Sequence, residues 1–436
     1  MMQSVFMSRR QQLLSELPAN SIALVPAATE VKRNADTDYL FRQDSSFYYL
    51  TGFKEPEALA IFVPNRAAGS YILLTRARNP EMEIWTGYRA GPDGAMNDYA
   101  ADEAFLIDDA IEILSELIVG KTALYYPIGA TCWLDDFVAD YISERRYQGR
   151  KGEIYPQQIC NIDPLIHAMR VIKSPEEISL LRNAASLSAK AHVAAMQATK
   201  PGCFEYQLEG TLRYHFMQAG AKEVAYTPIV AAGANACVLH YVDNDAQVQA
   251  GDLVLIDAGG EYDYYAADIT RTFPANGQFS EPQRALYEVV LAAQLAGIDA
   301  VRPGIAWNDI EATIVRAITA GLVRLGLLSG DVDGLIKSRA YTEFYMHRFG
   351  HMLGLDVHDP CQYKQGDAWV QLRPGMVLTM EPGIYVHPDN EQVEAKWRGI
   401  GIRIEDDILV TATGCEVLTH EAPKTVAEIE ALMQTS

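Results

Sequence analysis

The sequence lacks several features that would assign it to common classes of protein. Its six cysteines are scattered without a CxxC pair, so neither a zinc ribbon nor a disulfide framework is indicated. Lys and Arg number only 36 against 57 Asp and Glu, and the net charge of −21 argues against binding to nucleic acid or an anionic membrane surface. No apolar run reaches the roughly 18 residues of a spanning helix, and no apolar segment follows the N-terminal arginines as in a secretory signal. We therefore expect a cytoplasmic protein with no nucleic-acid or membrane partner.

The length and patterning of the chain indicate two domains. It has 436 residues, of which 49% are hydrophobic, enough for large cores. The first part alternates short β-prone runs such as SIALVP and SYILLT with helical patterns such as DDAIEILSELIVG, which is typical of an α/β domain. A strong helix start follows at Ser174, with proline at the first helical position and Glu177 placed for a capping box. We predict an α/β N-terminal domain over residues 1–172 and a second domain over residues 173–436.

The second domain contains a faint internal repeat. Two expected helices end in Lys200-Pro201-Gly202 and Arg302-Pro303-Gly304, and each is followed by a second helical pattern. Each helix pair precedes an expected strand, GDLVLIDAG or GMVLTMEPG, with a carboxylate six residues after its opening glycine. The shared order favours an ancient duplication over chance.

Residues 398–410 read RGIGIRIEDDILV and predict a strand with isoleucines on one face. The other face carries Arg403 and Glu405, and it is either solvated, as is usual for such strands, or directed into a site. Partner carboxylates elsewhere in the chain would favour the site. Asp406 falls on the isoleucine face, so we expect a strand irregularity there or a buried hydrogen-bonded partner.

Three further carboxylates on expected β-structure supply those partners. Asp257 ends the buried run LVLI, Asp268 returns beside it on the following strand, and Glu381 closes MVLTM. A carboxylate at the end of a buried run is costly unless it meets a cation or caps a helix. Between the halves lies FYMHRFGHMLGLDVHDP, which holds three of the nine histidines.

Four carboxylates with one imidazole form an oxygen-rich ligand set. Such a set suits divalent Mn, Co or Zn better than a thiolate site would. Converging negative charges repel one another at short range, and two divalent ions would balance them. A pair of ions about 4 Å apart can hold a bridging hydroxide and polarise a carbonyl group. The pattern therefore predicts metal-assisted hydrolysis.

In combination, the phrases IDAG, DITRTF, LGLDVHD, MEPGIY and GIRIEDD resemble the pita-bread metallopeptidases, the family of methionine aminopeptidase, prolidase and aminopeptidase P. In the first domain, ADTDYLFRQDSSFYYLTGFKEPEA and EIWTGYR resemble bacterial aminopeptidase P, the Xaa-Pro aminopeptidase. The resemblance covers nearly the whole chain. It implies an α+β fold, with a pita-bread catalytic domain of pseudo-twofold symmetry after a smaller α/β N-terminal domain.

The resemblance also implies roles for particular residues. The metal ligands would be Asp257, Asp268, His351, Glu381 and Glu405, with Glu381 also accepting the proton of the attacking water. His240 and His358 would contact the substrate carbonyl and stabilise the tetrahedral intermediate. Arg403 would hold the carboxylates in register, while the substrate would meet His347, Tyr385, Asp36 and Trp85, the last from a neighbouring subunit.

The implied activity is release of the N-terminal residue from peptides with proline in second position, through a hydroxide bridging two metal ions. The metal would be Mn, with Co or Zn as alternatives, and the enzyme would be a homodimer or homotetramer. A prolidase restricted to Xaa-Pro dipeptides is the nearest alternative, and a non-catalytic peptide-binding module is another. The sequence departs from the family at His347-Arg348, where His-Gly is common, and at Pro360-Cys361-Gln362. These departures bear on loop shape and on preference for the residue before proline.

Overall fold

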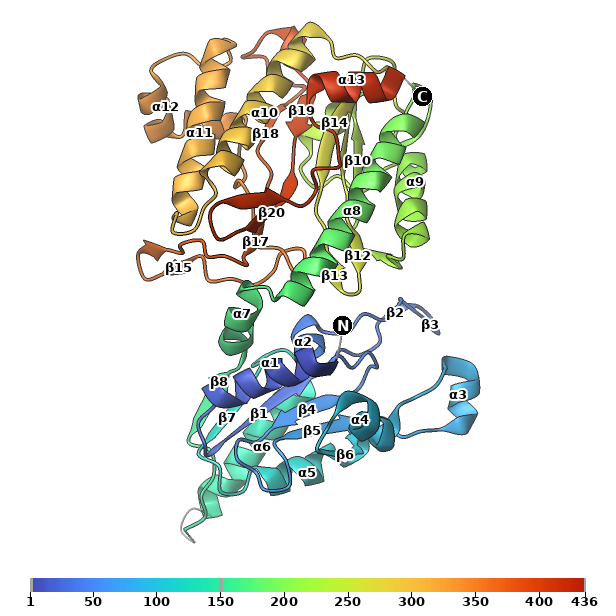
Figure 1. Cartoon of the computed structure of the whole chain (residues 1–436), viewed down its shortest axis with the longest axis vertical. Coiled ribbons are helices and arrows are strands. Elements are labelled where there is room, and N and C mark those ends of the chain that lie inside the picture. The colour runs from blue at the N-terminus through green and yellow to red at the C-terminus, as the bar shows by residue number, and fades with distance from the viewer. Residues whose placement is uncertain (1–2, 149–151, 435–436) are drawn as a thin grey trace. The chain divides into compact units, whose positions relative to one another are not determined.

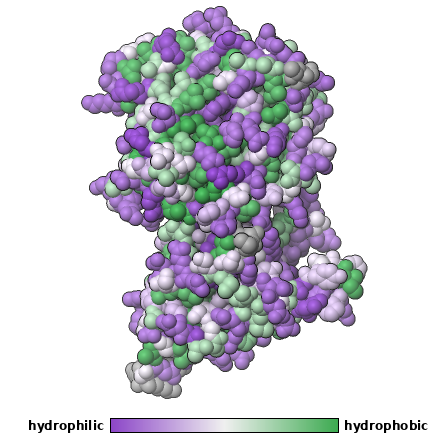
Figure 2. Space-filling model, viewed as in Figure 1, coloured by the Kyte–Doolittle hydropathy of each residue, from purple (hydrophilic) through white to green (hydrophobic). Residues whose placement is uncertain are grey.

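The computed structural model describes residues 3–148 and 152–434 and divides into two compact units, residues 1–169 and residues 170–436 (Figure 1). Each unit has a hydrophobic core of its own. None of the six cysteines forms a disulfide. Within the described residues, no helix combines the length and apolarity needed to cross a bilayer. Figure 2 shows hydrophilic side chains spread over the visible face of the molecule, with smaller hydrophobic groups between them.

The N-terminal unit is built around a mixed sheet of six strands in the order β6-β5-β4-β1-β7-β8. Strands β1, β4 and β5 pair antiparallel, whereas β7 and β8 extend the sheet in parallel from β1, and β6 does so from β5. The strands of this sheet are β1 (Ser21–Pro26), β4 (Leu59–Phe62), β5 (Tyr71–Thr75), β6 (Glu103–Leu106), β7 (Ala123–Tyr126) and β8 (Gln158–Asn161). Two short strands, β2 (Lys32–Asn34) and β3 (Thr37–Asp38), form a separate pair in the same unit.

Helices cover both faces of this sheet. Side chains of α5 and α6 pack with Ile22, Ile61 and Ile72 on one face. On the other face, the guanidinium of Arg10 in α1 lies 4.3 Å from the ring centroid of Tyr71. The helices are α1 (Gln3–Glu16), α2 (Ser45–Thr51), α3 (Pro80–Thr86), α4 (Gly91–Tyr99), α5 (Ala110–Leu117), α6 (Cys132–Gln148) and α7 (Asp163–Val171), the last of which crosses the boundary between the units.

The C-terminal unit consists of two helix pairs that flank strands lying between them (Figure 1). The pairs are α8 (Pro175–Ala198) with α9 (Glu205–Gln218), and α10 (Glu281–Ala300) with α11 (Trp307–Arg324). Further elements are α12 (Val332–Ser338), α13 (Val426–Gln434), β9 (Glu223–Val224), β10 (Ile229–Ala232), β11 (Leu253–Asp257), β12 (Gly260–Tyr262), β13 (Tyr265–Ala266), β14 (Thr270–Pro274), β15 (Lys364–Gln365), β16 (Ala368–Trp369), β17 (Val377–Met380), β18 (Gly383–Val386), β19 (Ile400–Arg403), β20 (Asp406–Val410) and β21 (Cys415–Val417).

The two halves of this unit repeat the same local structure. Helices α8 and α10 both open with a serine capping box and a proline in the first turn, and the box predicted at Ser174 is confirmed. After each Pro-Gly pair an isolated antiparallel bridge forms, Phe204 with Gln247 and Ala306 with Gln371. Each half contributes a three-stranded sheet, β10-β11-β14 or β17-β20-β21. The matches occur at equivalent positions of the aligned sequence repeat, and this is the pattern that a duplication would leave.

Candidate metal centre

A cavity of about 470 Å³ in the C-terminal unit brings together all five predicted ligands. Its wall also contains the predicted residues His240, His347, His358 and Arg403. Tyr385 is buried behind the wall, where its hydroxyl lies 2.9 Å from Nε2 of His347. The charged face of the strand at residues 398–410 is therefore directed into a cavity and not into bulk solvent.

The first two carboxylates lie beside each other because of strand pairing. Asp257 is the last residue of β11 and pairs with Thr270 at the start of β14, and Asp268 lies two residues earlier. The hydroxyl of Tyr226 lies 2.6 Å from Oδ1 of Asp257 and also hydrogen-bonds Oδ1 of Asp268. Thr270, on the same face of the strand as Asp268, donates its hydroxyl to Oε2 of Glu405 at 2.7 Å.

The remaining predicted ligands come from the second half of the C-terminal unit. Glu381 follows β17, and Glu405 lies between β19 and β20. The His351 segment runs against β17: the backbone N–H of Thr379 donates to the carbonyl of His351 at 2.9 Å, and the N–H of Glu381 donates to that of Phe349 at 2.8 Å. These two bonds fix the imidazole beside the glutamate.

The geometry of His351 suits it to metal binding. Its Nδ1 lies 3.1 Å from the carbonyl oxygen of Met352, a contact that favours the tautomer with the proton on Nδ1 and leaves Nε2 as the nitrogen that could bind a metal ion. Nε2 lies 3.4 Å from Oδ2 of Asp268 and 3.6 Å from Oε1 of Glu381. Ligand atoms of Asp268, His351 and Glu405 all lie within 4.8 Å of one another. This group could hold a metal ion.

The electrostatics of the cavity indicate the same chemistry. Burial, followed by the charge of Asp257, raises the pKa of Asp268 well above its usual range. Burial and then the charge of Asp268 do the same to the pKa of Glu405. Burial and Glu405 raise the pKa of Glu381 to about 8. Carboxylates that oppose one another's ionisation in this way would be relieved by divalent cations, so the donor set fits such ions.

Arg403 is the cation that the chain itself places among these carboxylates. Its side chain is 4% exposed, and Nη2 donates to Oδ2 of Asp257 at 2.6 Å. Nη1 donates to the hydroxyl of Tyr385 at 3.0 Å, and Nε donates to Oγ1 of Thr270 at 3.2 Å. The guanidinium is thereby held in one orientation against the first ligand.

The other predicted histidines lie around the predicted ligands and differ in how deeply they are buried. The ring of His358 meets that of His351 edge to face, with centroids 4.3 Å apart, and burial lowers the pKa of His358. Burial also lowers the pKa of His347 to about 4, so this ring stays neutral near pH 7. His240 is exposed at the rim.

Asp36 and Trp85 are not among the residues that line this cavity. Both belong to the N-terminal unit and both are exposed, with Trp85 at 83% on α3. Ile84 and Tyr88 beside Trp85 are also exposed, at 82% and 91%. This segment thus presents a cluster of apolar side chains on its surface.

Sequence reasoning missed a buried ion pair behind His358. The next residue, Asp359, accepts from Nη2 of Arg170 at 2.6 Å and from Nζ of Lys173 at 3.0 Å. Burial alone would raise the pKa of Asp359, but the two cations hold it below its usual range. Tyr226 was missed as well, because its sequence neighbours carry no periodic signal. Thr270 could have been found, since it follows Asp268 at the spacing of one strand face.

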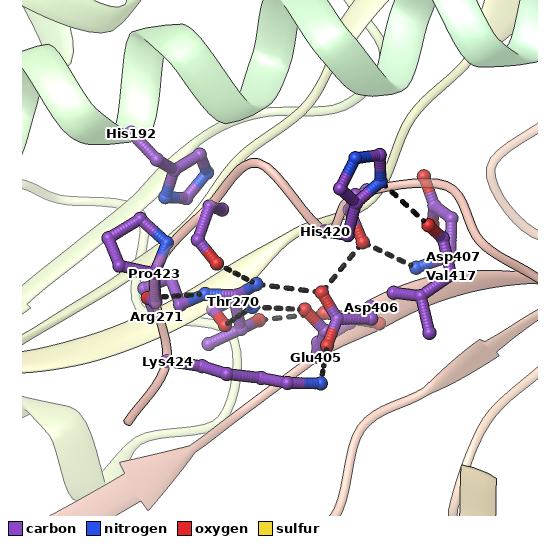
Figure 3. Close-up of polar contacts among 12 residues, drawn as sticks. His192, Thr270, Arg271, Glu405, Asp406, Asp407, Val417, His420, Pro423 and Lys424 are labelled. Carbon is purple, nitrogen blue, oxygen red and sulfur yellow. Dashed lines mark hydrogen bonds and ion pairs between the residues drawn. The ribbon is translucent and has the colours of Figure 1, made fainter. Parts of the chain in front are cut away.

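Asp406 has both of the features predicted for it. The strand is interrupted, with β19 ending at Arg403 and β20 starting at Asp406. Its carboxylate accepts from Nη2 of Arg271 and Nζ of Lys424, both at 2.7 Å (Figure 3). It also accepts from Oγ1 of Thr419 and Nε2 of Gln294. Burial opposes ionisation, but Arg271 and Lys424 lower the pKa of Asp406 to about 2. Arg271 also donates to the backbone carbonyl of Glu405, so this buried network supports the last of the predicted ligands.

The C-terminal unit has two repeated halves, and both contribute carboxylates to the cavity that also holds the imidazole of His351. This combination is typical of a metal-dependent hydrolase. The model of metallopeptidase family M24 matches residues 179–412, and that of the aminopeptidase P N-terminal domain matches residues 6–125. The chain belongs to metallopeptidase family M24. The predicted pita-bread catalytic domain, preceded by a smaller α/β domain, is confirmed.

Individual relatives match along the whole chain. A Xaa-Pro aminopeptidase of Escherichia coli is 44% identical over 429 residues, which is 98% of this chain and 97% of that protein. The structure of Pseudomonas aeruginosa aminopeptidase PepP superposes with a TM-score of 0.98 at 54% identity, covering 100% of this chain and 98% of that one. A zinc-substituted E. coli aminopeptidase P in complex with product gives 0.96 at 43% identity, covering 100% and 99%.

Proposed function

We propose that this enzyme is a Xaa-Pro aminopeptidase, which removes the N-terminal residue from peptides with proline in second position. The observation that carries the proposal is the convergence of five metal-ligand side chains with Arg403 in one cavity. Two bacterial Xaa-Pro aminopeptidases are 44% and 42% identical to this chain over 98% of its length, which supports this choice of substrate. The proposal includes a catalytic domain over residues 173–436 and an N-terminal domain over residues 1–172.

Two divalent ions are part of the proposal, with Mn as the first choice and Co or Zn as alternatives. They would be held by Asp257, Asp268, His351, Glu381 and Glu405. When bound, such ions polarise the scissile carbonyl and lower the pKa of a water molecule. The donor set and the mutual repulsion of its buried carboxylates support two ions as the balancing charge.

The chain's own residues would supply the other steps. Glu381 would accept a proton from the attacking water. Burial and Glu405 raise its pKa to about 8 without bound cations, so the carboxylate form that this role needs depends on the divalent ions that it would help to hold. His240 and His358 donate hydrogen bonds to the oxygen that becomes negative as the carbonyl is attacked. Neutral His347, hydrogen-bonded to Tyr385, lines the space beside the ligands. Arg403 donates to Asp257 and holds this carboxylate in place beside the other predicted ligands.

The N-terminal unit would contribute through assembly into a homodimer or homotetramer. The exposed apolar cluster at Ile84, Trp85 and Tyr88 supports a role for α3 at a subunit contact. Trp85 would then meet substrate held by a neighbouring subunit, and Asp36 would line the substrate region. A cytoplasmic location is part of the same proposal.

The decisive test is a peptide panel assayed separately with Mn, Co and Zn. We expect cleavage of Xaa-Pro-Yaa peptides and longer ones, with matched Xaa-Ala-Yaa peptides cleaved far more slowly. Cleavage of Xaa-Pro dipeptides alone would identify a prolidase instead. Activity that survives both Asp268→Ala and thorough chelation would refute a metal mechanism of any kind.

A further inference from the structure

A second cavity adjoins the metal cavity. Its volume is about 440 Å³, and both His347 and Arg348 line it as well as the first. The rest of its wall comes from the start of α11, the turn after α12, and β16, and includes Asn308, Glu311, Arg339, Tyr345 and Trp369. The two cavities therefore adjoin at His347 and Arg348.

The wall of the second cavity carries polar groups that the described part of the chain leaves without partners. Oδ1 of Asn308 and the hydroxyl of Tyr345 are buried and have no hydrogen-bond partner there. Burial raises the pKa of Tyr345 well above its usual range, so its hydroxyl keeps its proton. Buried polar groups are normally paired, so these two atoms indicate that the wall of the second cavity is incompletely packed.

The two cavities also differ in charge. The first holds Asp257, Asp268, Glu381 and Glu405. The second holds Arg339 and Arg348 against the single carboxylate of Glu311, which accepts a hydrogen bond from the backbone N–H of Phe349 at 3.3 Å. Among the described residues, no carboxylate oxygen lies within 4.0 Å of the Arg348 guanidinium. Arg348 is an exposed residue that lines both cavities, so its guanidinium is accessible to an anionic group of a ligand.

We propose that the second cavity is a subsite for the part of the peptide that follows proline, and that Arg348 binds a carboxylate of the substrate there. The inference rests on the proposed function and extends it along the same substrate. A short peptide carries an ammonium at one end and a carboxylate at the other, and the acidic and basic cavities match that polarity. The carboxylate belongs either to the C-terminus of a short peptide or to an acidic side chain after proline.

Paired substrates test the proposal. Ala-Pro-Ala is compared with its C-terminal amide, and the amidated peptides Ala-Pro-Ala-Glu and Ala-Pro-Ala-Gln are compared with each other. We expect the carboxylate-bearing member of at least one pair to have about fivefold higher kcat/KM, mainly through a lower KM, as for an ion pair at a partly exposed site. A preference in the first pair assigns the C-terminus as the ligand, and a preference only in the second assigns the side chain.

Variants then locate the effect. In Arg348→Gln, the ratio of the two kcat/KM values within a pair should fall close to one. Arg348→Lys should retain part of the preference because the charge remains. Arg316→Gln is the matched control, since Arg316 is an exposed arginine of α11 that pairs with Asp333 and lines neither cavity; it should retain the whole preference. Equal rates for both pairs in the unmodified enzyme, or a preference that persists in Arg348→Gln, would overturn the proposal.

A binding measurement separates this inference from the proposed function. Calorimetry of Pro-Ala and its amide with the metal-free protein should give tighter binding of the free acid, and Arg348→Gln should abolish the difference. If no Xaa-Pro peptide is cleaved with any metal but this difference is present, the peptidase proposal fails and the subsite stands. If cleavage occurs and neither pair differs, only the subsite fails.

Discussion

At the scale of single residues, Tyr226 is the side chain that ties two carboxylates of the site together. Its hydroxyl contacts Asp257 and Asp268, and burial raises its pKa well above the usual range, so it remains a donor. Tyr226→Phe removes one hydrogen bond to a charged group without changing the shape of the side chain. We expect the kcat of the metal-loaded enzyme to fall about tenfold, the loss of roughly one charge-assisted hydrogen bond.

Tyr214→Phe is the control for that change, because Tyr214 is an exposed tyrosine of α9 away from the cavity. Circular dichroism and unfolding temperature should match between the two variants. A Tyr226→Phe enzyme with unchanged kcat and unchanged metal affinity would show that the hydroxyl does not support the ligands.

His192 should make stability depend on pH. It is fully buried, its Nε2 lies 2.9 Å from the carbonyl oxygen of Ala258, and burial lowers its pKa to about 4. Between that value and the unfolded value near 6.5, the unfolded chain binds the proton and the folded chain does not. Stability is therefore complete above about pH 6.5 and declines as the pH falls toward 4, by about 3 kcal/mol in all.

Unfolding of the metal-free protein by urea at a series of pH values measures this dependence. In His192→Gln, the free energy of unfolding should depend less on pH between pH 4 and 6.5. His387→Gln, which changes an exposed histidine, should leave this dependence as it is in the unmodified protein. Identical slopes for His192→Gln and the unmodified protein would assign the pH dependence to other groups.

At the scale of elements, the close approach of the His351 segment to β17 depends on Gly350. A Cβ atom on Gly350 would lie 2.1 Å from the carbonyl oxygen of Thr379, which is backbone and cannot turn aside. Gly350→Ala should therefore displace the strand or the ligand segment. We expect at least a 100-fold loss of activity together with destabilisation of about 2 kcal/mol, typical of overpacking.

Gly210→Ala provides the comparison, since nothing lies within 4 Å of the added atom and the residue is exposed inside α9. Because alanine favours a helix interior over glycine, Gly210→Ala should raise the free energy of unfolding by about 0.5–1 kcal/mol and leave the activity unchanged. Full activity in Gly350→Ala would mean that the loop can move away without moving His351.

Some features of these elements can be predicted from a single sequence, and others cannot. The helix start at Ser174 and the carboxylates at strand ends are local signals, and the structure has them where they were expected. The partners of Asp359 lie 186 and 189 residues earlier, and nothing near them marks Arg170 and Lys173 as its cations. Contacts of this kind depend on how distant elements pack, so a single sequence gives no local signal for them.

At the scale of the whole molecule, metal binding should stabilise the folded chain. The five proposed ligands converge only in the folded state, so an ion at 100 times its dissociation constant should add about 2.7 kcal/mol to the free energy of unfolding. We expect Mn to raise the unfolding temperature, a chelator to reverse the rise, and Asp268→Ala to abolish it.

The size of this stabilisation should depend on pH. The pKa of Glu381 is about 8 in the metal-free protein, so below that value an ion must displace a proton. The increment should therefore be larger at pH 8.5 than at pH 6.5 at equal metal concentration. An increment that is independent of pH would show that Glu381 is not a ligand.

The internal repeat of the C-terminal unit has a consequence for synthesis. Asp257 and Asp268 come from the first half, whereas His351, Glu381 and Glu405 come from the second. A growing chain that has left the ribosome only as far as α10 contains two of the five predicted ligands and lacks His351. If these five residues are the ligands, the metal site is complete only after Glu405 has been made, and we expect no activity from a chain that is still shorter than this.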